Sequence, residues 1–280
     1  MEIKASDVKA LRDKTGAGMM ECKKALQHCN GDAKEAEKYL KEKGLAAVEK
    51  RADRVTSEGI ILIHNDEKKA SMIEMTCETD FVAKNEDFIG VGNDIAKTAF
   101  DKNLSEITPD LNDKLLDLAT RVRENMNLTR LVLVKAEADE YISRYVHSDK
   151  KTGVIVVLKA EKPEIFGKKE VQDFAYDCCL HAAAFVPLYV KKEDVDSAYI
   201  KEQEEIFRGQ TADLDKPENV KEGIIKGKIN KHLSDICFLE QPFVKDDKVS
   251  VSKKMAEIGK AAGSNLSLSK LVMFRLGVNA

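Results

Sequence analysis

From Gly59 onward the chain shows one order of elements twice, and this repeat limits the folds that it can adopt. The segments GIILIH (59–64) and ASMIEMTC (70–77) flank the polar turn NDEKK and predict a β-hairpin. Two helical patterns and a strand follow, and then YISRYVH (141–147) and GVIVVLKA (153–160) predict a second hairpin. An antiparallel sheet covered by helices accounts for each copy, so we predict an α+β fold with two related core subdomains.

The helices of the first copy follow from apolar residues three and four positions apart. One helix is expected from about Asn85, and the next has Thr108 as its cap and Pro109 at its first position. The strand LVLVKAEA (131–138) closes this copy. The residues expected on the buried helix faces are Phe88, Val91, Ile95, Ala99, Leu111, Leu115, Leu118 and Val122.

The second copy has the same parts. A helix is expected from about Lys168, and another leads through Gly263 to the closing strand KLVMFRLG (270–277). The residues expected on their buried faces are Val171, Phe174, Cys178, Ala182, Phe185, Val251, Met255, Ile258 and Ala262.

An insertion separates the two helices of the second copy, from about residue 191 to 236. Its two charged arms meet near Asp215-Lys216-Pro217 and carry apolar stripes too narrow to form a core alone, which favours an antiparallel helical hairpin. The stripe residues are Val195, Tyr199, Ile206, Val220, Ile224 and Leu233. The tip of this hairpin either docks a partner or is a solvated arm, and the sequence leaves both open.

Three short helices are predicted before the repeat, within residues 6–44. Ser6 is the expected cap of the first, Asp32 caps the third in a capping box, and Gly44 closes it. The charged segment VEKRADRVTSEG joins this unit to the rest. The expected domains are the helical head and linker at 1–55, a core subdomain at 56–139, and a second core subdomain with the insertion at 140–280.

Charge and hydropathy exclude several classes of function. Lys and Arg number 46 against 49 Asp and Glu, a net charge of −3, which argues against a nucleic-acid binder. The sequence contains no run of eighteen apolar residues, the length needed to span a membrane. Its charged start lacks the apolar core of a signal peptide, so we expect a cytoplasmic protein.

Six cysteines without a C-x-x-C pair are expected to be reduced thiols.

Two features of the head suggest a phosphate-binding loop and a metal site, but neither matches the pattern that such a site requires. TGAG at 15–18 has no following Lys-Ser/Thr and no preceding strand, so it fails as a phosphate loop, and a turn between helices is the better interpretation. Cys22, His28 and Cys29 lack a fourth ligand and match no zinc spacing. We expect no metal, no cofactor and no direct nucleotide binding.

Candidate catalytic groups are equally weak. Asp80 and Asp87 fit a solvated acidic pair better than an acid-base pair, because no metal or polarising group accompanies them. Cys178 and Cys179 fit small buried residues better than nucleophiles. We therefore predict that the chain is not an enzyme, with a cysteine-dependent enzyme kept as one alternative.

Apolar residues in turns remain unexplained. Met19 and Met20 follow a glycine turn, which places at least one thioether away from the core. Phe81 precedes a helix whose apolar stripe is complete without it. The pattern alone favours core packing of Phe81 over exposure to a partner.

Two motifs together suggest a family. VKALRDKTGAGMMECKKAL (8–26) and TDFVAKN (79–85) closely resemble the signature regions of the bacterial elongation factor Ts family, whose members exchange guanine nucleotide on elongation factor Tu. The resemblance extends to Tyr145-Val146-His147, to Pro187 and to QPFV at 241–244. It implies a ubiquitin-associated-like head and two related core halves.

The resemblance also implies how such a chain would act. The loop with Phe81 would enter the partner GTPase and disturb its Mg²⁺ site, while the head grips the nucleotide domain, with no chemistry by the chain itself. The contact residues that it implies are Thr79, Asp80, Phe81 and Val82 in the loop, Arg12, Met19, Met20 and Lys23 in the head, and Met126 and His147 in the core. Homodimer contacts of the complex are left open.

Two departures from the family pattern stand out. Arg123 replaces the glycine of the common G-E-N motif, so the turn before Met126 is expected to differ. The sequence stops at Asn279-Ala280, where some members continue into another helical module.

The other alternative to the exchange function is an adaptor that binds a helix or peptide through its head, without exchange activity.

Overall fold

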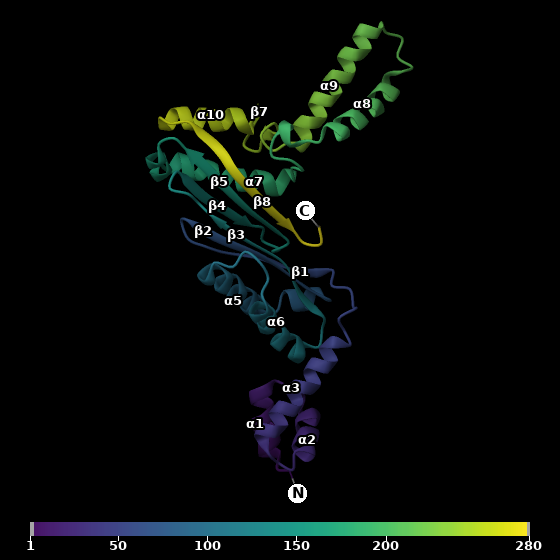
Figure 1. The fold of residues 1–280 in the computed structure, drawn as a ribbon, viewed down its shortest axis with the longest axis vertical. Helices are drawn as coiled ribbons and strands as arrows, with labels where there is room; N and C mark the ends of the chain where they lie inside the picture. The colour runs from purple at the N-terminus through teal and green to yellow at the C-terminus, as the bar shows by residue number, and fades with distance from the viewer. Residues whose placement is uncertain (1–2, 279–280) are drawn as a thin grey trace. The chain divides into compact units, whose positions relative to one another are not determined.

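The computed structural model describes residues 3–278 (Figure 1). Contacts within the chain divide it into two units. Unit 1 takes in the residues up to Val134, Ser148–Thr152 and the chain from Phe274 onward. Unit 2 takes in Lys135–His147 and Gly153–Met273. Helix and sheet occur in both units, so the α+β class is confirmed. The domain boundaries expected at 55 and 139 stay predictions.

Unit 1 begins with three helices, α1 (Ala5–Thr15), α2 (Met19–His28) and α3 (Ala33–Glu49). They share a small apolar core made of Val8, Leu11, Cys22, Ala25, Leu26 and Ala36. The expected cap at Asp32 is confirmed, because its carboxylate accepts the backbone N–H groups of Lys34 and Glu35 at 2.8 and 3.0 Å.

Two expected helix boundaries in this part are wrong. Lys4, rather than Ser6, is the N-cap of α1, and Ser6 lies inside the helix with its hydroxyl on Asp7. Helix α3 continues five residues past Gly44. A Cβ at Gly44 would lie 3.0 Å from the Thr120 Cβ, so this glycine allows α3 to approach another helix instead of ending it.

The sheet of unit 1 has the order β1-β2-β3, with β1 at Glu58–Asn65, β2 at Lys69–Cys77 and β3 at Met126–Lys135. The predicted hairpin is confirmed, with Ile60 opposite Met75 and Leu62 opposite Ile73. Strand β3 begins five residues before the predicted Leu131. Residues 126–129 alternate buried and exposed, the pattern of a strand with one covered face.

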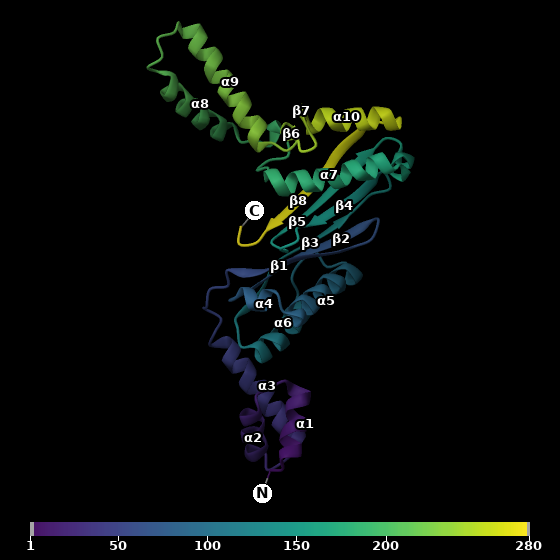
Figure 2. The same ribbon diagram turned by 180° about the vertical axis from the view of Figure 1, so that it is seen from behind.

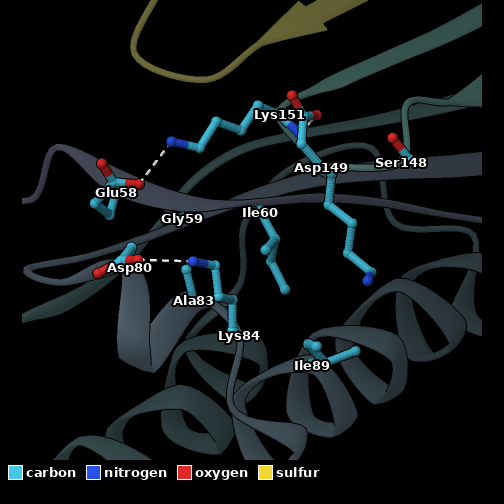
Figure 3. A pocket seen from close by; sticks show the side chains of 11 residues that line it. Glu58, Gly59, Ile60, Asp80, Ala83, Lys84, Ile89, Ser148, Asp149 and Lys151 are labelled. Atoms are coloured by element: carbon cyan, nitrogen blue, oxygen red, sulfur yellow. Dashed lines mark hydrogen bonds and ion pairs between the residues drawn. The ribbon is translucent and has the colours of Figure 1, made fainter.

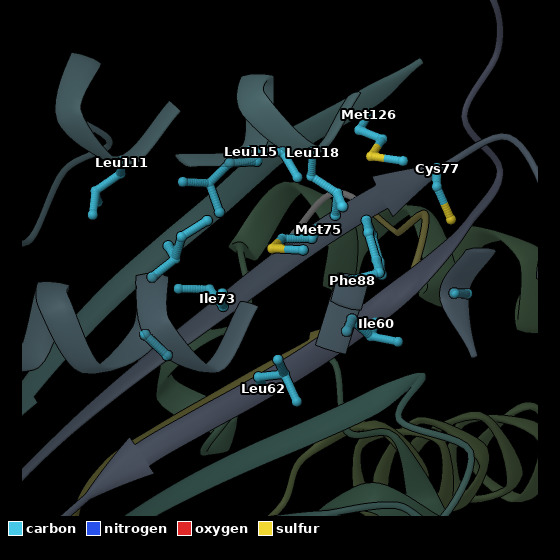
Figure 4. Packing of buried hydrophobic residues seen from close by; sticks show 14 of the residues in the cluster. Ile60, Leu62, Ile73, Met75, Cys77, Phe88, Leu111, Leu115, Leu118 and Met126 are labelled. Carbon is cyan, nitrogen blue, oxygen red and sulfur yellow. The ribbon is translucent and has the colours of Figure 1, made fainter. Parts of the chain in front are cut away.

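Helices α5 (Glu86–Lys102) and α6 (Pro109–Val122) cover one face of this sheet, and the single turn α4 (Asp80–Ala83) joins β2 to α5 (Figure 2). Phe88 lies fully buried among side chains from the sheet and from α6 (Figure 4). The predicted buried faces are confirmed, with Val91 and Val122 partly buried at the edge of the cluster. This packing fixes the strand and helix ends that flank α4.

The sheet of unit 2 has the matching order β4-β5-β8, from Glu140–Val146, Thr152–Ala160 and Leu266–Arg275. Its helices are α7 (Lys169–Phe185) and α10 (Val251–Ala262), with a short helical turn η1 (Pro163–Gly167) before α7. A ribbon of β6 (Pro242–Phe243) and β7 (Asp246–Ser250) precedes α10 and was not predicted. The predicted burial of Phe185 is wrong, because α7 ends there and leaves the ring half exposed.

The insertion forms the predicted helical hairpin. After the short turn η2 (Lys192–Asp194), helices α8 (Ser197–Thr211) and α9 (Glu218–Ile236) run side by side and extend away from α7 and α10 (Figure 2). The apolar stripe differs from the prediction. Ile206 and Val220 are exposed, and Ile225 is buried in place of Ile224. Within residues 3–278, no helix combines the length and apolar character needed to span a bilayer.

Candidate partner-binding site

Phe81 lies on the single turn α4 and is 83% exposed, the highest value among the exposed large apolar residues. Val82 and Ala83 on the same turn are buried in the core of unit 1. Successive side chains of a helical turn point in different directions, so anchoring these two residues leaves Phe81 facing solvent. The exposure implied by the family resemblance is confirmed, and the core packing favoured by the pattern alone is wrong.

Asp80 forms an ion pair beside this exposed ring. Lys84 Nζ lies 2.7 Å from the Asp80 Oδ2, one helical turn away. The hydrogen bond from Lys84 lowers the pKa of the Asp80 carboxyl, because it favours the charged form. The tip of α4 thus presents an aromatic ring next to a negative charge.

A cleft of about 640 Å³ lies beside α4 within unit 1 (Figure 3). Its residues are Glu58, Gly59, Ile60, Asp80, Ala83, Lys84, Ile89 and the turn 148–151. Lys151 Nζ is 2.7 Å from Glu58 Oε2, and that hydrogen bond raises the pKa of Lys151. Glu58 is paired with Lys151 and Asp80 with Lys84, and the acidic and basic residues of the lining are equal in number, so the lining carries no net charge.

The head presents the other implied contact residues on its surface. Met19 and Met20 open α2 and are both exposed, Met20 to 64%, which confirms the expectation that at least one thioether leaves the core. Arg12 on α1 and Lys23 on α2 are exposed as well. The head therefore carries thioethers and positive charge on its surface.

The remaining implied residues differ in their surroundings. Val82 and Met126 are buried in the same apolar cluster of unit 1, so neither side chain is offered to a partner in this structure. His147 belongs to unit 2, where it is exposed with its ring edge-on to Tyr145, 6.2 Å between centroids. The structure thus brings Thr79, Asp80 and Phe81 together at the surface.

The cysteines offer no reactive thiolate at the candidate positions. Cys178 and Cys179 are completely buried, and burial raises the pKa of both, that of Cys179 to about 12. Cys22, His28 and Cys29 do not come together as a metal-binding group, and the described part of the chain contains no cluster of three such ligands. The geometry therefore supports surface recognition, without a catalytic centre at these residues.

Glu124 is a site residue that the sequence pattern does not indicate. Its Oε2 accepts the backbone N–H groups of Glu78 and Thr79, both at 3.1 Å, and its Oε1 accepts the Thr79 hydroxyl at 2.7 Å. It follows α6, 45 residues after Thr79. No local pattern in the sequence signals a contact over that separation.

Comparison with known proteins gives one consistent result. A family model described as elongation factor TS matches residues 78–278. The elongation factor Ts of Treponema denticola is 84% identical over 278 residues, covering 99% of both chains. That of Treponema pallidum is 54% identical, covering 99% of this chain and all of the relative, and that of Borreliella burgdorferi is 40% identical, covering 98% and 99%.

Proposed function

Because the chain belongs to the elongation factor TS family, we propose that it accelerates GDP release from the GTPase elongation factor Tu and that Phe81 enters the partner near its Mg²⁺ site. The observation that carries the proposal is the exposure of Phe81 beside two buried neighbours. A large apolar ring held out in solvent contributes nothing to the core and is suited to a pocket on a partner. Relatives along nearly the whole chain do not favour the adaptor alternative.

The mechanism is differential binding. An exchange factor lowers GDP affinity by binding the nucleotide-free GTPase more tightly than the GDP-bound form, and linkage makes the two effects equal in size. Burying one Phe side chain contributes about 1.5–3 kcal/mol, roughly a tenfold to hundredfold shift if the burial occurs only in the open state. No covalent step by the chain is required.

Other contacts complete the proposed interface. Arg12, Met19, Met20 and Lys23 of a ubiquitin-associated-like head would hold the nucleotide domain of the partner, and exposure of all four supports this. His147 would add a contact from unit 2, whereas Val82 and Met126 would act by packing beneath the exposed residues. We place this activity in the cytoplasm, where translation takes place.

The test is release of a fluorescent GDP analogue from purified elongation factor Tu. The wild-type chain should accelerate release, and Phe81→Ala should lower the maximal rate by roughly tenfold to hundredfold, following the free energy of burying one Phe side chain. Val55→Ala is the control, since Val55 is also 82% exposed but lies before β1. No acceleration by the wild type would overturn the function, and full activity of Phe81→Ala would overturn the role of Phe81.

A further inference from the structure

The turn between α6 and β3 contacts three segments that are distant in the sequence. We call Arg123-Glu124-Asn125 the junction turn. Arg123 ends α6 with φ 68°, the left-handed region that favours glycine, and its guanidinium lies 2.5 Å from the Glu21 carboxylate on α2. The helix thus keeps a left-handed cap without glycine, and the arginine side chain adds an ion pair to the head.

Asn125 fixes the junction turn from the other end. Its side-chain amide donates to the carbonyls of Ala52 at 3.0 Å and Arg54 at 2.7 Å, and its backbone N–H donates to Glu78 Oε1 at 2.6 Å. Asn125 is almost completely buried. Glu124, between these two anchored residues, therefore has little freedom to change its position.

The Glu124 carboxylate holds the residues directly before Phe81. It accepts two backbone N–H groups and one hydroxyl, and hydrogen bonds to a charged acceptor are the stronger class. Thr79 connects Glu124 to the helical turn itself. Its hydroxyl donates to Glu124 and accepts the Val82 N–H at 3.4 Å. Cys77 adds a thiol contact to the Thr79 carbonyl at 3.2 Å.

From this geometry we propose that Glu124 is a positioning residue that fixes the direction of Phe81. The proposal rests on the exchange function proposed above. Packing of Val82 and Ala83 keeps α4 on the core but does not by itself set the rotation of this single helical turn about its axis. Three hydrogen bonds at its N-terminal end remove that rotation, so the Phe81 ring meets the partner already oriented.

A double-mutant cycle separates positioning from general support of the fold. The chains compared are the wild type, Glu124→Ala, Phe81→Ala and the double variant, each assayed for the maximal rate of GDP-analogue release at saturating exchange factor. Glu124→Ala should lower that rate about tenfold, equivalent to ~1.4 kcal/mol. In the Phe81→Ala background the same change should alter the rate less than about twofold, because the two residues act as one unit.

Matched variants distinguish the loss of positioning from a loss of folding. Glu106→Ala removes the same charge from an exposed position and should keep the wild-type rate. If Glu124→Ala does not fold, Glu124→Gln replaces it in the cycle, since Gln keeps the size and one acceptor oxygen but loses the charge. In the free protein, the Glu78 and Thr79 amide protons should exchange faster with solvent in the Glu124 variant than in the wild type.

Each outcome decides between two causes. Losses that multiply in the double variant, or a Glu124 variant with an unchanged rate, would overturn the positioning role while the exchange function stands. A wild-type chain that does not accelerate release would overturn the exchange function, and the positioning role with it. Coupled losses together with faster exchange of the two amide protons would support both.

Discussion

Each unit leaves the second strand of its hairpin through a short helical turn, and the two turns place a phenylalanine in opposite environments. In unit 1, α4 carries Phe81 at 83% exposure. In unit 2, η1 carries Phe166 at 8% exposure, stacked on Tyr141 with 5.5 Å between ring centroids. The same place in the element order thus serves the core in one unit and the surface in the other.

The difference teaches that the exposure of Phe81 is not a consequence of the fold type. Unit 2 buries both Ile165 and Phe166 at this connection. Unit 1 fills the corresponding core with Val82 and Ala83 and leaves the larger residue outside. Burial of a Phe side chain stabilises a fold by about 1.5–3 kcal/mol, so unit 1 forgoes that stabilisation at Phe81.

The largest expected effect is on the buried side of the comparison. Phe166→Ala removes a packed ring and should lower the free energy of unfolding by about 3–5 kcal/mol, because the lost transfer energy is joined by a cavity. Urea denaturation followed by far-UV circular dichroism measures it. A loss below about 1 kcal/mol would show that Phe166 is not part of a rigid core and would weaken the contrast with Phe81.

A smaller effect should distinguish unit 2 by its response to acid. His181 on α7 is fully buried, with its ring nitrogens on the Gln241 side chain and the Val244 N–H, and burial lowers its pKa below the ordinary 6.5. Below about pH 6.5 the unfolded chain therefore binds more protons at this residue than the folded chain does. The free energy of unfolding therefore decreases as the pH is lowered. The slope is at most about 1.4 kcal/mol per pH unit.

Urea denaturation at pH 7.5 and pH 5.5 checks this slope. His181→Gln should remove most of the pH dependence, whatever its own baseline stability, whereas His28→Gln, at an exposed histidine, should keep it. Equal slopes in the wild type and His181→Gln would assign the acid sensitivity to another group.

The smallest expected effect lies on the exposed side. Phe81→Ala should change the free energy of unfolding by less than about 0.5 kcal/mol, since surface substitutions away from packed or strained positions stay within that range. The measurement is the same urea titration as for Phe166→Ala. A loss above about 1 kcal/mol would mean that the ring supports unit 1, and the two turns would then differ less than their exposure suggests.

The sequence predicted elements whose pattern is local. Both hairpins and helix α5 were placed correctly, and the Asn85 side chain accepts the Asp87 N–H at 2.8 Å, as expected for an N-cap. Helix α3 was ended too early because the role of Gly44 depends on Thr120, which lies far along the chain. Helix start and stop residues in the local sequence cannot reveal that a glycine allows close packing between two helices.

The candidate site divides in the same way. Exposure of Met19 and Met20 followed from a turn directly before them. The direction of the Phe81 side chain could not be predicted from the types of the neighbouring residues. It depends on which of those neighbours are buried in the folded core and on Glu124, 45 residues after Thr79. The family resemblance supplied the expected exposure, whereas the hydrogen bonds that accompany it became visible only in the structure.

The discontinuity of unit 1 has a consequence for biosynthesis. Arg130 on β3 stacks its guanidinium on the Phe274 ring at 4.3 Å and donates to the Arg275 carbonyl at 2.6 Å, and Leu276 donates to the Lys151 carbonyl at 2.9 Å. At usual rates of translation, the ribosome needs on the order of ten seconds to proceed from Val134 to Phe274. In the nascent chain, Arg130 therefore lacks its aromatic neighbour until the ribosome has reached Phe274.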